Sequence, residues 1–176
     1  RAPVLSPDWA AVEQNAQPRC TTKAPQLRSL VETLRAEVSE CRSKKGLAFP
    51  IAGMLALIAQ ATFSGVRRGP QDLADYAATL SQGQLRALGF RCDKHTGRVR
   101  CPGVTPFRDV LIGVDADALE RALLAWQEQL LGPAQDDLVI VDGKTLRHAH
   151  LELVSAVNGQ GRWLGTVAVP EGSNEI

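Results

Sequence analysis

The sequence predicts an α+β protein in which helices precede a small antiparallel sheet. Up to Gly132, apolar residues recur with the spacing of amphipathic helices. After Gly132 the pattern changes, because the compact β-branched run 138–141 is followed by two further strand-like segments, 151–157 and 163–169. The sequence Asn-Gly-Gln-Gly at 158–161 is typical of a hairpin turn, so the last two strands are expected to pair.

The helices are predicted from start and end signals as well as from spacing. Ser81 and Asp115 are suitable starts, Thr105 before Pro106 favours a cap and first turn, and glycines favour helix ends. The predicted helical segments are 25–42, 50–64, a short one around 73–80, 81–88, one from Thr105 and one from Asp115 to Gly132. The residues expected to face inward are Leu27, Leu30, Val31, Leu34, Val38, Leu73, Tyr76, Ala77, Leu80, Leu85, Leu88, Phe107, Val110, Leu111, Leu119, Leu123, Trp126 and Leu130.

Charge is unevenly distributed along a chain of 176 residues whose formal net charge is only +1. Residues 42–108 carry eleven basic and three acidic side chains, whereas residues 109–141 carry one basic and seven acidic ones. The small net charge excludes a uniformly basic coat, but the basic segment is a candidate surface for nucleic acid. The alternative interpretation is a solvated surface balanced by the acidic helix that follows.

The stretch 46–66 contains no charged residue and is long enough to span a bilayer. Pro50, Gly53 and several polar residues interrupt it, and basic residues flank both of its ends. We therefore favour a helix buried at the centre of a helical domain over a membrane span, and we expect no membrane partner.

Four cysteines in a chain of this length do not make a small disulfide framework, so we expect a reducing cytoplasm. Cys92, His95 and Cys101 lie close together in the sequence and raise the hypothesis of a zinc-stabilised module. Their spacing is irregular and a fourth ligand is missing, so loop thiols beside a loop histidine are the favoured interpretation.

The basic loop 91–104 and the helix from Pro106 are similar to the second half of a helix-turn-helix. In this interpretation the loop contacts phosphates and the exposed face of the helix enters a groove. The alternative is a helical bundle that only supports the domain that follows. The candidate DNA contacts are Arg67, Arg68, Arg91, Lys94, Arg98, Arg100 and Arg108.

Asp142 follows the apolar run 138–141, so the sequence places a carboxylate at the end of a buried strand. An unpaired carboxylate there is costly and needs a partner or a metal ion. Carboxylates at strand ends build the two-metal sites of phosphoryl transfer, where magnesium takes hard oxygen ligands. Lys144 and Arg147 follow and are candidates to contact phosphates. The alternative is that Asp142 and Gly143 form a simple turn.

Three motifs near the end of the chain are distinctive: VDGKTLR at 141–147, LVSAV at 153–157 and LGTVAVPEGSNEI at 164–176. They follow the helical segments PIAGMLALIAQATFSGVRR, LADYAATLSQGQLRALGF and VDADALERALLAWQEQLL. Together these segments resemble the bacterial insertion-sequence transposases called H-repeat-associated proteins, the ISAs group. The resemblance covers about residues 44–176, and its most specific part is DGKTLR with SNEI at this separation.

The resemblance implies a DDE transposase, which binds the terminal inverted repeats of its element and cuts DNA by magnesium-dependent phosphoryl transfer on a ribonuclease-H-like fold. Asp142 matches the first catalytic carboxylate of the family and would be a magnesium ligand. Glu175 is not expected to be the catalytic glutamate, because the third carboxylate of the family lies further along. The other motif residues that match the family are Gly143, Lys144, Thr145, Arg147, Asn174 and Glu175.

The chain also departs from the family pattern. The second Asp and the final Glu are absent from these residues, so one catalytic carboxylate of three is present. Glu152 stands where the family tends to have His, and Gly172 replaces a Lys. Because a two-metal site needs more ligands, we expect the chain to be an inactive fragment with no magnesium bound. The alternative is a non-enzymatic DNA-binding remnant of a transposase.

The expected organisation has three parts. Residues 1–43 form a leader and an amphipathic helix, and residues 44–132 form an all-α, DNA-binding transposase-associated domain. Residues 133–176 supply the first three antiparallel strands of a truncated ribonuclease-H-like catalytic domain. The resemblance further implies double-stranded DNA as the partner, a location in the bacterial cytoplasm with the nucleoid, and a homo-oligomer for the intact transposase.

Overall fold

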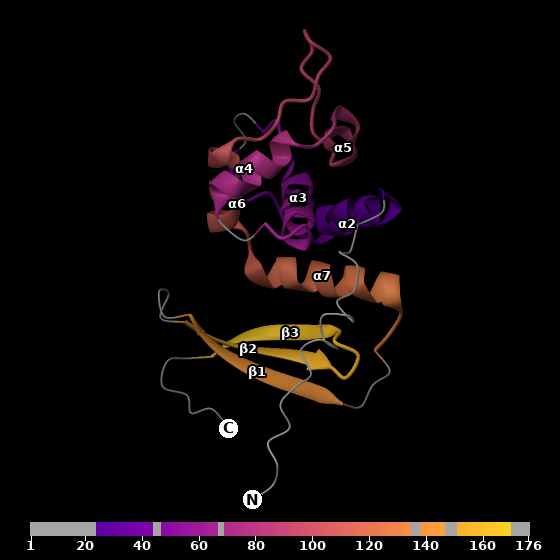
Figure 1. Cartoon of the computed structure of the whole chain (residues 1–176), viewed down its shortest axis with the longest axis vertical. Coiled ribbons are helices and arrows are strands. Elements are labelled where there is room, and N and C mark those ends of the chain that lie inside the picture. Colours follow the sequence, from indigo (N-terminus) through magenta and orange to yellow (C-terminus); the bar gives the residue numbers. More distant parts are fainter. Residues whose placement is uncertain (1–23, 44–46, 67–68, 135–137, 147–150, 170–176) are drawn as a thin grey trace, which may run out of the picture.

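The computed structural model of the chain describes residues 24–43, 47–66, 69–134, 138–146 and 151–169. Within these ranges it contains six helices and one three-stranded antiparallel sheet, so the predicted α+β class is confirmed (Figure 1). Five residues proposed above as site or motif residues lie outside the described ranges: Arg67, Arg68, Arg147, Asn174 and Glu175.

Helix α3 lies at the centre of the helical part, where α2, α4 and α6 pack against it. Met54, Ala56 and Leu57 of α3 are fully buried, so the uncharged stretch forms the predicted buried helix. No helix in the described part of the chain is long and apolar enough to cross a membrane. The helices are α2 (Ala24–Glu37), α3 (Ile51–Phe63), α4 (Pro70–Ala78), α5 (Gln82–Ala87), α6 (Val104–Gly113) and α7 (Ala116–Leu131).

Helices α2 and α7 close one side of this core and pack against each other. The apolar stripe predicted for α2 is buried throughout. On α7 the buried residues are Ala118 and Ala122, whereas Leu130, which was predicted to face inward, is 39% exposed. The difference arises because α7 lies between α2 and the sheet, and small residues allow its close approach to α2.

Local sequence signals set several helix ends as predicted. Ser81 and Gln84 form a reciprocal capping box at the start of α5, and the Asp115 carboxylate accepts a hydrogen bond from the Ala118 N–H at 3.1 Å. Gly89 and Gly132 follow α5 and α7 with positive φ angles of 78° and 74°.

The start of α6 was predicted incorrectly. Its N-cap is Gly103, which provides no side-chain cap, and Thr105 lies inside the helix. The buried residue Pro102 fixes the chain just before this point, so packing places the helix start ahead of the Thr-Pro signal. Phe107 and Val110 are fully buried as expected, but Leu111 is 45% exposed and does not belong to the core.

The sheet consists of β1 (Val139–Leu146), β2 (Leu151–Asn158) and β3 (Trp163–Val169), in the order β1-β2-β3. The predicted hairpin between β2 and β3 is confirmed. Its turn is held by the Asn158 side-chain oxygen, which accepts hydrogen bonds from the N–H groups of Gln160 and Arg162 at 3.1 and 2.8 Å.

Helix α7 joins the helical part to the sheet along the outer edge of β3 (Figure 1). The Glu120 carboxylate accepts a hydrogen bond from the Thr166 N–H at 2.6 Å, and the Gln127 amide donates one to the Trp163 carbonyl at 2.7 Å. Side chains of a helix therefore satisfy backbone groups that an edge strand would otherwise expose.

We predict that Gly53→Ala destabilises the fold, because Gly53 of α3 lies against the chain at the end of α5. A Cβ atom at this position would lie 2.1 Å from the Leu88 carbonyl oxygen and 2.8 Å from the Phe90 ring. Since a backbone atom must move, the free energy of unfolding should fall by about 1–3 kcal/mol in urea denaturation. The matched control is Gly83→Ala in α5, whose new Cβ would have no neighbour closer than 3.8 Å. Equal stability of the two variants would contradict this packing.

Candidate nucleic-acid interface

Between α5 and α6 the chain forms a short hairpin of residues 91–100, which we call the basic finger, that projects from the helical part (Figure 1). Cys92 and Val99 form an antiparallel bridge, and the Asp93 N–H donates a hydrogen bond to the Arg98 carbonyl at 2.8 Å. The basic loop predicted from sequence is therefore a projection closed by one antiparallel bridge and its own hydrogen bonds.

Asp93 organises the tip of the finger. One oxygen of its carboxylate accepts hydrogen bonds from the N–H groups of His95 and Thr96, both at 3.0 Å. The other oxygen forms an ion pair with Arg100 at 3.0 Å. The N–H groups of Thr96 and His95 are the main reason why the pKa of Asp93 is lowered, and the charge of Arg100 adds to this effect. The carboxylate thus holds the turn in one shape.

The base of the finger is fixed to the helical core. Phe90 is buried and its ring meets that of Phe49 edge to face, with centroids 5.1 Å apart. The side-chain amide of Gln82 pairs with both backbone groups of Val99, accepting from its N–H at 2.8 Å and donating to its carbonyl at 3.1 Å. Val99 itself is buried. These contacts hold the finger against α5.

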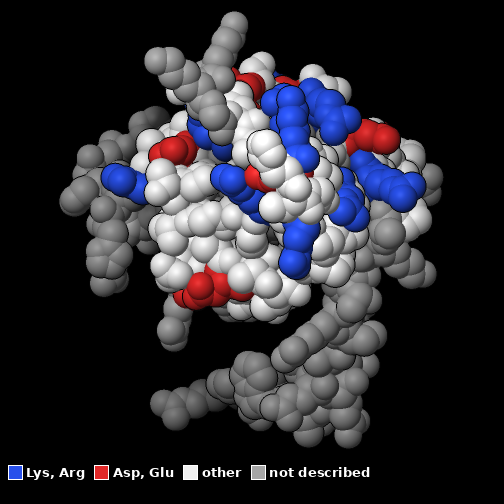
Figure 2. Space-filling model, turned by 90° about the horizontal axis from the view of Figure 1, so that it is seen from above, with Lys and Arg blue, Asp and Glu red and all other residues white. Residues whose placement is uncertain are grey.

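The finger presents basic side chains to solvent. Arg91, Lys94, Arg98 and Arg100 are all exposed, and they were all candidate DNA contacts. Seen from the end that carries the finger, Lys and Arg side chains gather on one face of the molecule (Figure 2). Residues 86–100 contain five basic side chains and one acidic one, and that acidic residue, Asp93, is already bound within the finger.

Arg86 belongs to this surface although sequence reasoning did not select it. It lies on α5, and its guanidinium donates a hydrogen bond to the Gly97 carbonyl near the tip at 3.1 Å. The partner is eleven residues away in the sequence, so the contact depends on how the finger folds back toward α5. Its position in the basic segment 42–108 was the one available signal.

The arrangement differs from a helix-turn-helix. The finger separates α5 from α6, and α6 packs against α3 and α4. A helix-turn-helix joins its two helices by a short turn, which residues 88–103 do not form. Arg108 is exposed on α6, and among the described residues it makes no hydrogen bond to the finger.

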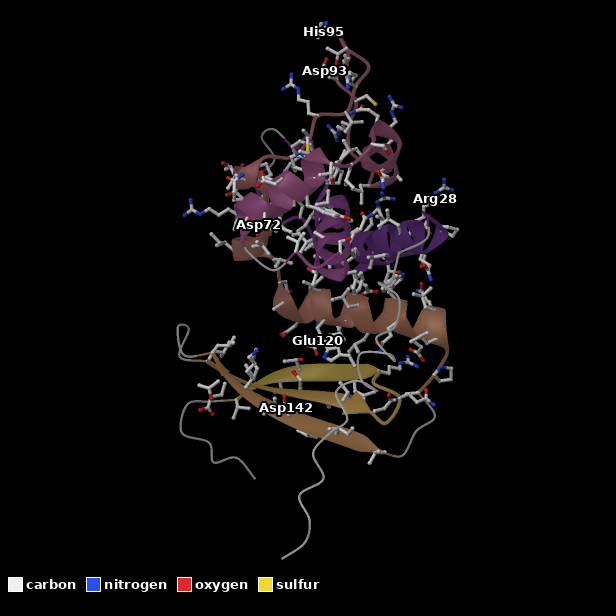
Figure 3. All side chains as sticks on the ribbon, viewed as in Figure 1. Arg28, Asp72, Asp93, His95, Glu120 and Asp142 are labelled. Carbon is white, nitrogen blue, oxygen red and sulfur yellow. The ribbon has the colours of Figure 1, made fainter. Side chains whose placement is uncertain are left out.

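The environment predicted for Asp142 is wrong. Asp142 lies within the eight-residue strand β1 rather than at its end, and the strand is exposed along most of its length (Figure 3). Val139 and Val141 are 52% and 62% exposed, since β1 is the edge of the sheet away from α7. Asp142 is therefore solvated, and the cost of burying a carboxylate does not demand a metal ion here.

Asp142 pairs with Ser155, and Ser155 pairs with Thr166, so the three side chains form a row across one face of the sheet. Glu152 pairs with Thr145, which places it on the opposite face. In the described part of the chain, no group of three or more His, Cys, Asp or Glu side chains could hold a metal ion. Gly143, Lys144 and Thr145 continue β1.

Comparison with protein-family models, with curated proteins and with solved structures gives no match to this chain.

We predict that the Asp93 carboxyl titrates below the ordinary range of aspartate, because its ionised form accepts two backbone hydrogen bonds. The order of the finger that depends on this carboxylate is present at neutral pH and is lost as the pH falls through the lowered pKa. An NMR titration that follows the side-chain carboxyl carbon of Asp93 measures this pKa directly.

Arg100→Gln is the matched variant for this titration. It should move the Asp93 midpoint upward by less than half of the total shift, because the backbone N–H groups make the larger contribution. A midpoint at the ordinary value in the unchanged protein would show that the turn does not form.

Proposed function

We propose that this chain binds double-stranded DNA through the basic finger. The supporting observation is the finger itself, a projection closed by one antiparallel bridge, with four exposed basic side chains and an internally bound acidic one. Phosphate contacts supply most of the affinity of non-specific DNA binding, and they require basic groups held at the surface. The finger provides such groups on a backbone with its own hydrogen bonds.

The shape of the finger also suits a duplex. The major groove of B-form DNA is about 12 Å wide and admits a two-stranded ribbon as well as a helix. With the tip in the groove, Arg91 and Arg98 would contact phosphates on either side, and His95 would face base edges at the tip. Arg86 would add a contact beside the tip because it is already bound to the Gly97 carbonyl.

We further propose that the DNA-binding unit belongs to a transposase of the insertion-sequence type. This proposal rests on the resemblance of the VDGKTLR, LVSAV and SNEI motifs, and the three antiparallel strands are compatible with the start of a ribonuclease-H-like sheet. Asp142 would be its first catalytic carboxylate. Among the described residues no second carboxylate joins Asp142 on its face of the sheet, so strand cleavage is not part of the function proposed for these residues.

The salt dependence of DNA binding tests the proposal. Five phosphate contacts, from Arg86, Arg91, Lys94, Arg98 and Arg100, should give a slope of log affinity against log salt of about −4 to −5. Replacement of Arg91 or Arg98 by Gln should reduce the magnitude of this slope by about one and weaken binding similarly for all sequences. Gel shifts or fluorescence anisotropy at several salt concentrations measure both quantities.

The matched control is Arg28→Gln, which removes the same charge from α2, away from the tip residues Asp93 and His95 (Figure 3). It should leave the slope unchanged. An equal loss of DNA affinity in the Arg28 and Arg98 variants would show that net charge, not the finger, attracts DNA. Absence of binding at about 50 mM salt would reject DNA as the partner.

A further inference from the structure

The basic finger has two arms, residues 91–93 and 97–100, and the backbone of the second arm points in two directions. The Asp93 N–H donates a hydrogen bond to the Arg98 carbonyl at 2.8 Å, so the Arg98 carbonyl faces the first arm. The backbone groups of successive residues in an extended chain point to alternate sides. The N–H and carbonyl of Val99 consequently point away from the first arm, along the outer edge of the finger.

Helix α5 binds this outer edge (Figure 1). The Gln82 amide accepts a hydrogen bond from the Val99 N–H at 2.8 Å and donates one to the Val99 carbonyl at 3.1 Å. Arg86 donates to the Gly97 carbonyl at 3.1 Å. Four residues span about 6 Å along a helix, and two residues span about 6.6 Å along an extended chain. Because the two spacings match, one face of α5 takes the place that a third arm of the finger would have.

Gln82 fixes the finger more closely than Arg86 does. A side-chain amide carries both a donor and an acceptor, so it can bind both backbone groups of one residue. Val99 is buried, and leaving its backbone groups unpaired would be costly. Gln82 is half-buried in the first turn of α5, directly after the Ser81 of the capping box, whereas Arg86 is exposed. The helix start, Gln82 and Val99 therefore form one connected path that sets the direction of the finger.

We propose that Gln82 is a positioning residue for DNA binding, and that the direction it gives the finger through Val99 makes the chain prefer duplex to single-stranded DNA. This inference rests on the function proposed above. A duplex holds its phosphates at fixed places on either side of a groove, so basic groups that are already fixed can meet them together. A single strand adapts to a finger in any direction. Residues 91–100 contain no Phe, Tyr or Trp on which single-stranded bases would stack.

Gln82→Met tests this role, because it removes both hydrogen-bonding groups and leaves the charge of the chain unchanged. Fluorescence anisotropy of the full chain compares a duplex with a single strand of the same sequence at one salt concentration. Duplex affinity should fall by about tenfold, since two backbone groups lose their partner and the finger must be ordered on binding. Single-strand affinity should change little. The slope of log affinity against log salt for the duplex should stay the same, because every basic side chain remains.

The matched control is Gln71→Met. The Gln71 amide donates its hydrogen bond to Asp75 at 2.9 Å, within α4 and not to the finger. The same substitution there should leave both affinities and their ratio unchanged. A loss of duplex affinity in this control equal to that of Gln82→Met would overturn the proposal.

Hydrogen exchange shows whether the contact itself is lost. The Val99 amide should exchange faster in Gln82→Met than in the unchanged protein. The amides of Met54 and Leu57 in α3 should keep their protection, which shows that the core of the variant is folded, since these residues are fully buried. A Val99 amide that exchanges equally fast in both proteins would show that Gln82 does not hold the finger.

The remaining outcomes separate this proposal from the function on which it rests. Faster exchange at Val99 with an unchanged ratio of duplex to single-strand affinity would overturn the positioning role, and so would an equal loss of both affinities. If Arg98→Gln still reduces the salt slope in that case, the finger binds DNA without the help of Gln82. If Arg98→Gln leaves the slope unchanged, the proposed function fails and the role of Gln82 fails with it.

Discussion

The contact between α7 and β3 determines how the two parts of the molecule are arranged. A β-strand at the edge of a sheet exposes backbone groups that must be bound by something. Here Glu120 and Gln127 bind the Thr166 N–H and the Trp163 carbonyl, so β3 is the edge that faces the helices. This arrangement leaves β1 at the far side of the sheet and the basic finger at the opposite end of the molecule (Figure 1).

The basic finger combines one acidic side chain with several exposed basic ones. In the finger, the carboxylate of Asp93 accepts hydrogen bonds from the N–H groups of the tip and pairs with Arg100, which leaves the exposed Arg91, Lys94 and Arg98 to act at long range on a polyanion.

The sequence was informative where structure depends on nearby residues. The helix starts at Ser81 and Asp115 formed as predicted, because the capping hydrogen bonds close within one helical turn. Thr105 failed as a cap because packing of the preceding chain set the helix start. The predicted burial of Asp142 was also wrong. An apolar run predicts a strand, but whether another element covers that strand depends on how the distant parts of the chain pack. Arg86 was missed for the same reason, since its partner Gly97 is brought close by the folded hairpin.

The most direct measurement of the central claim is an NMR titration of the amide signals of the chain with a short DNA duplex. If the finger is the binding surface, the largest changes will occur in residues 91–100 and at Arg86, with small changes on α7 and the sheet. The shifts should also disappear as salt is raised, because phosphate contacts dominate. Changes centred on β1–β3, or no localised change at low salt, would contradict the assignment of the finger as the DNA-binding element.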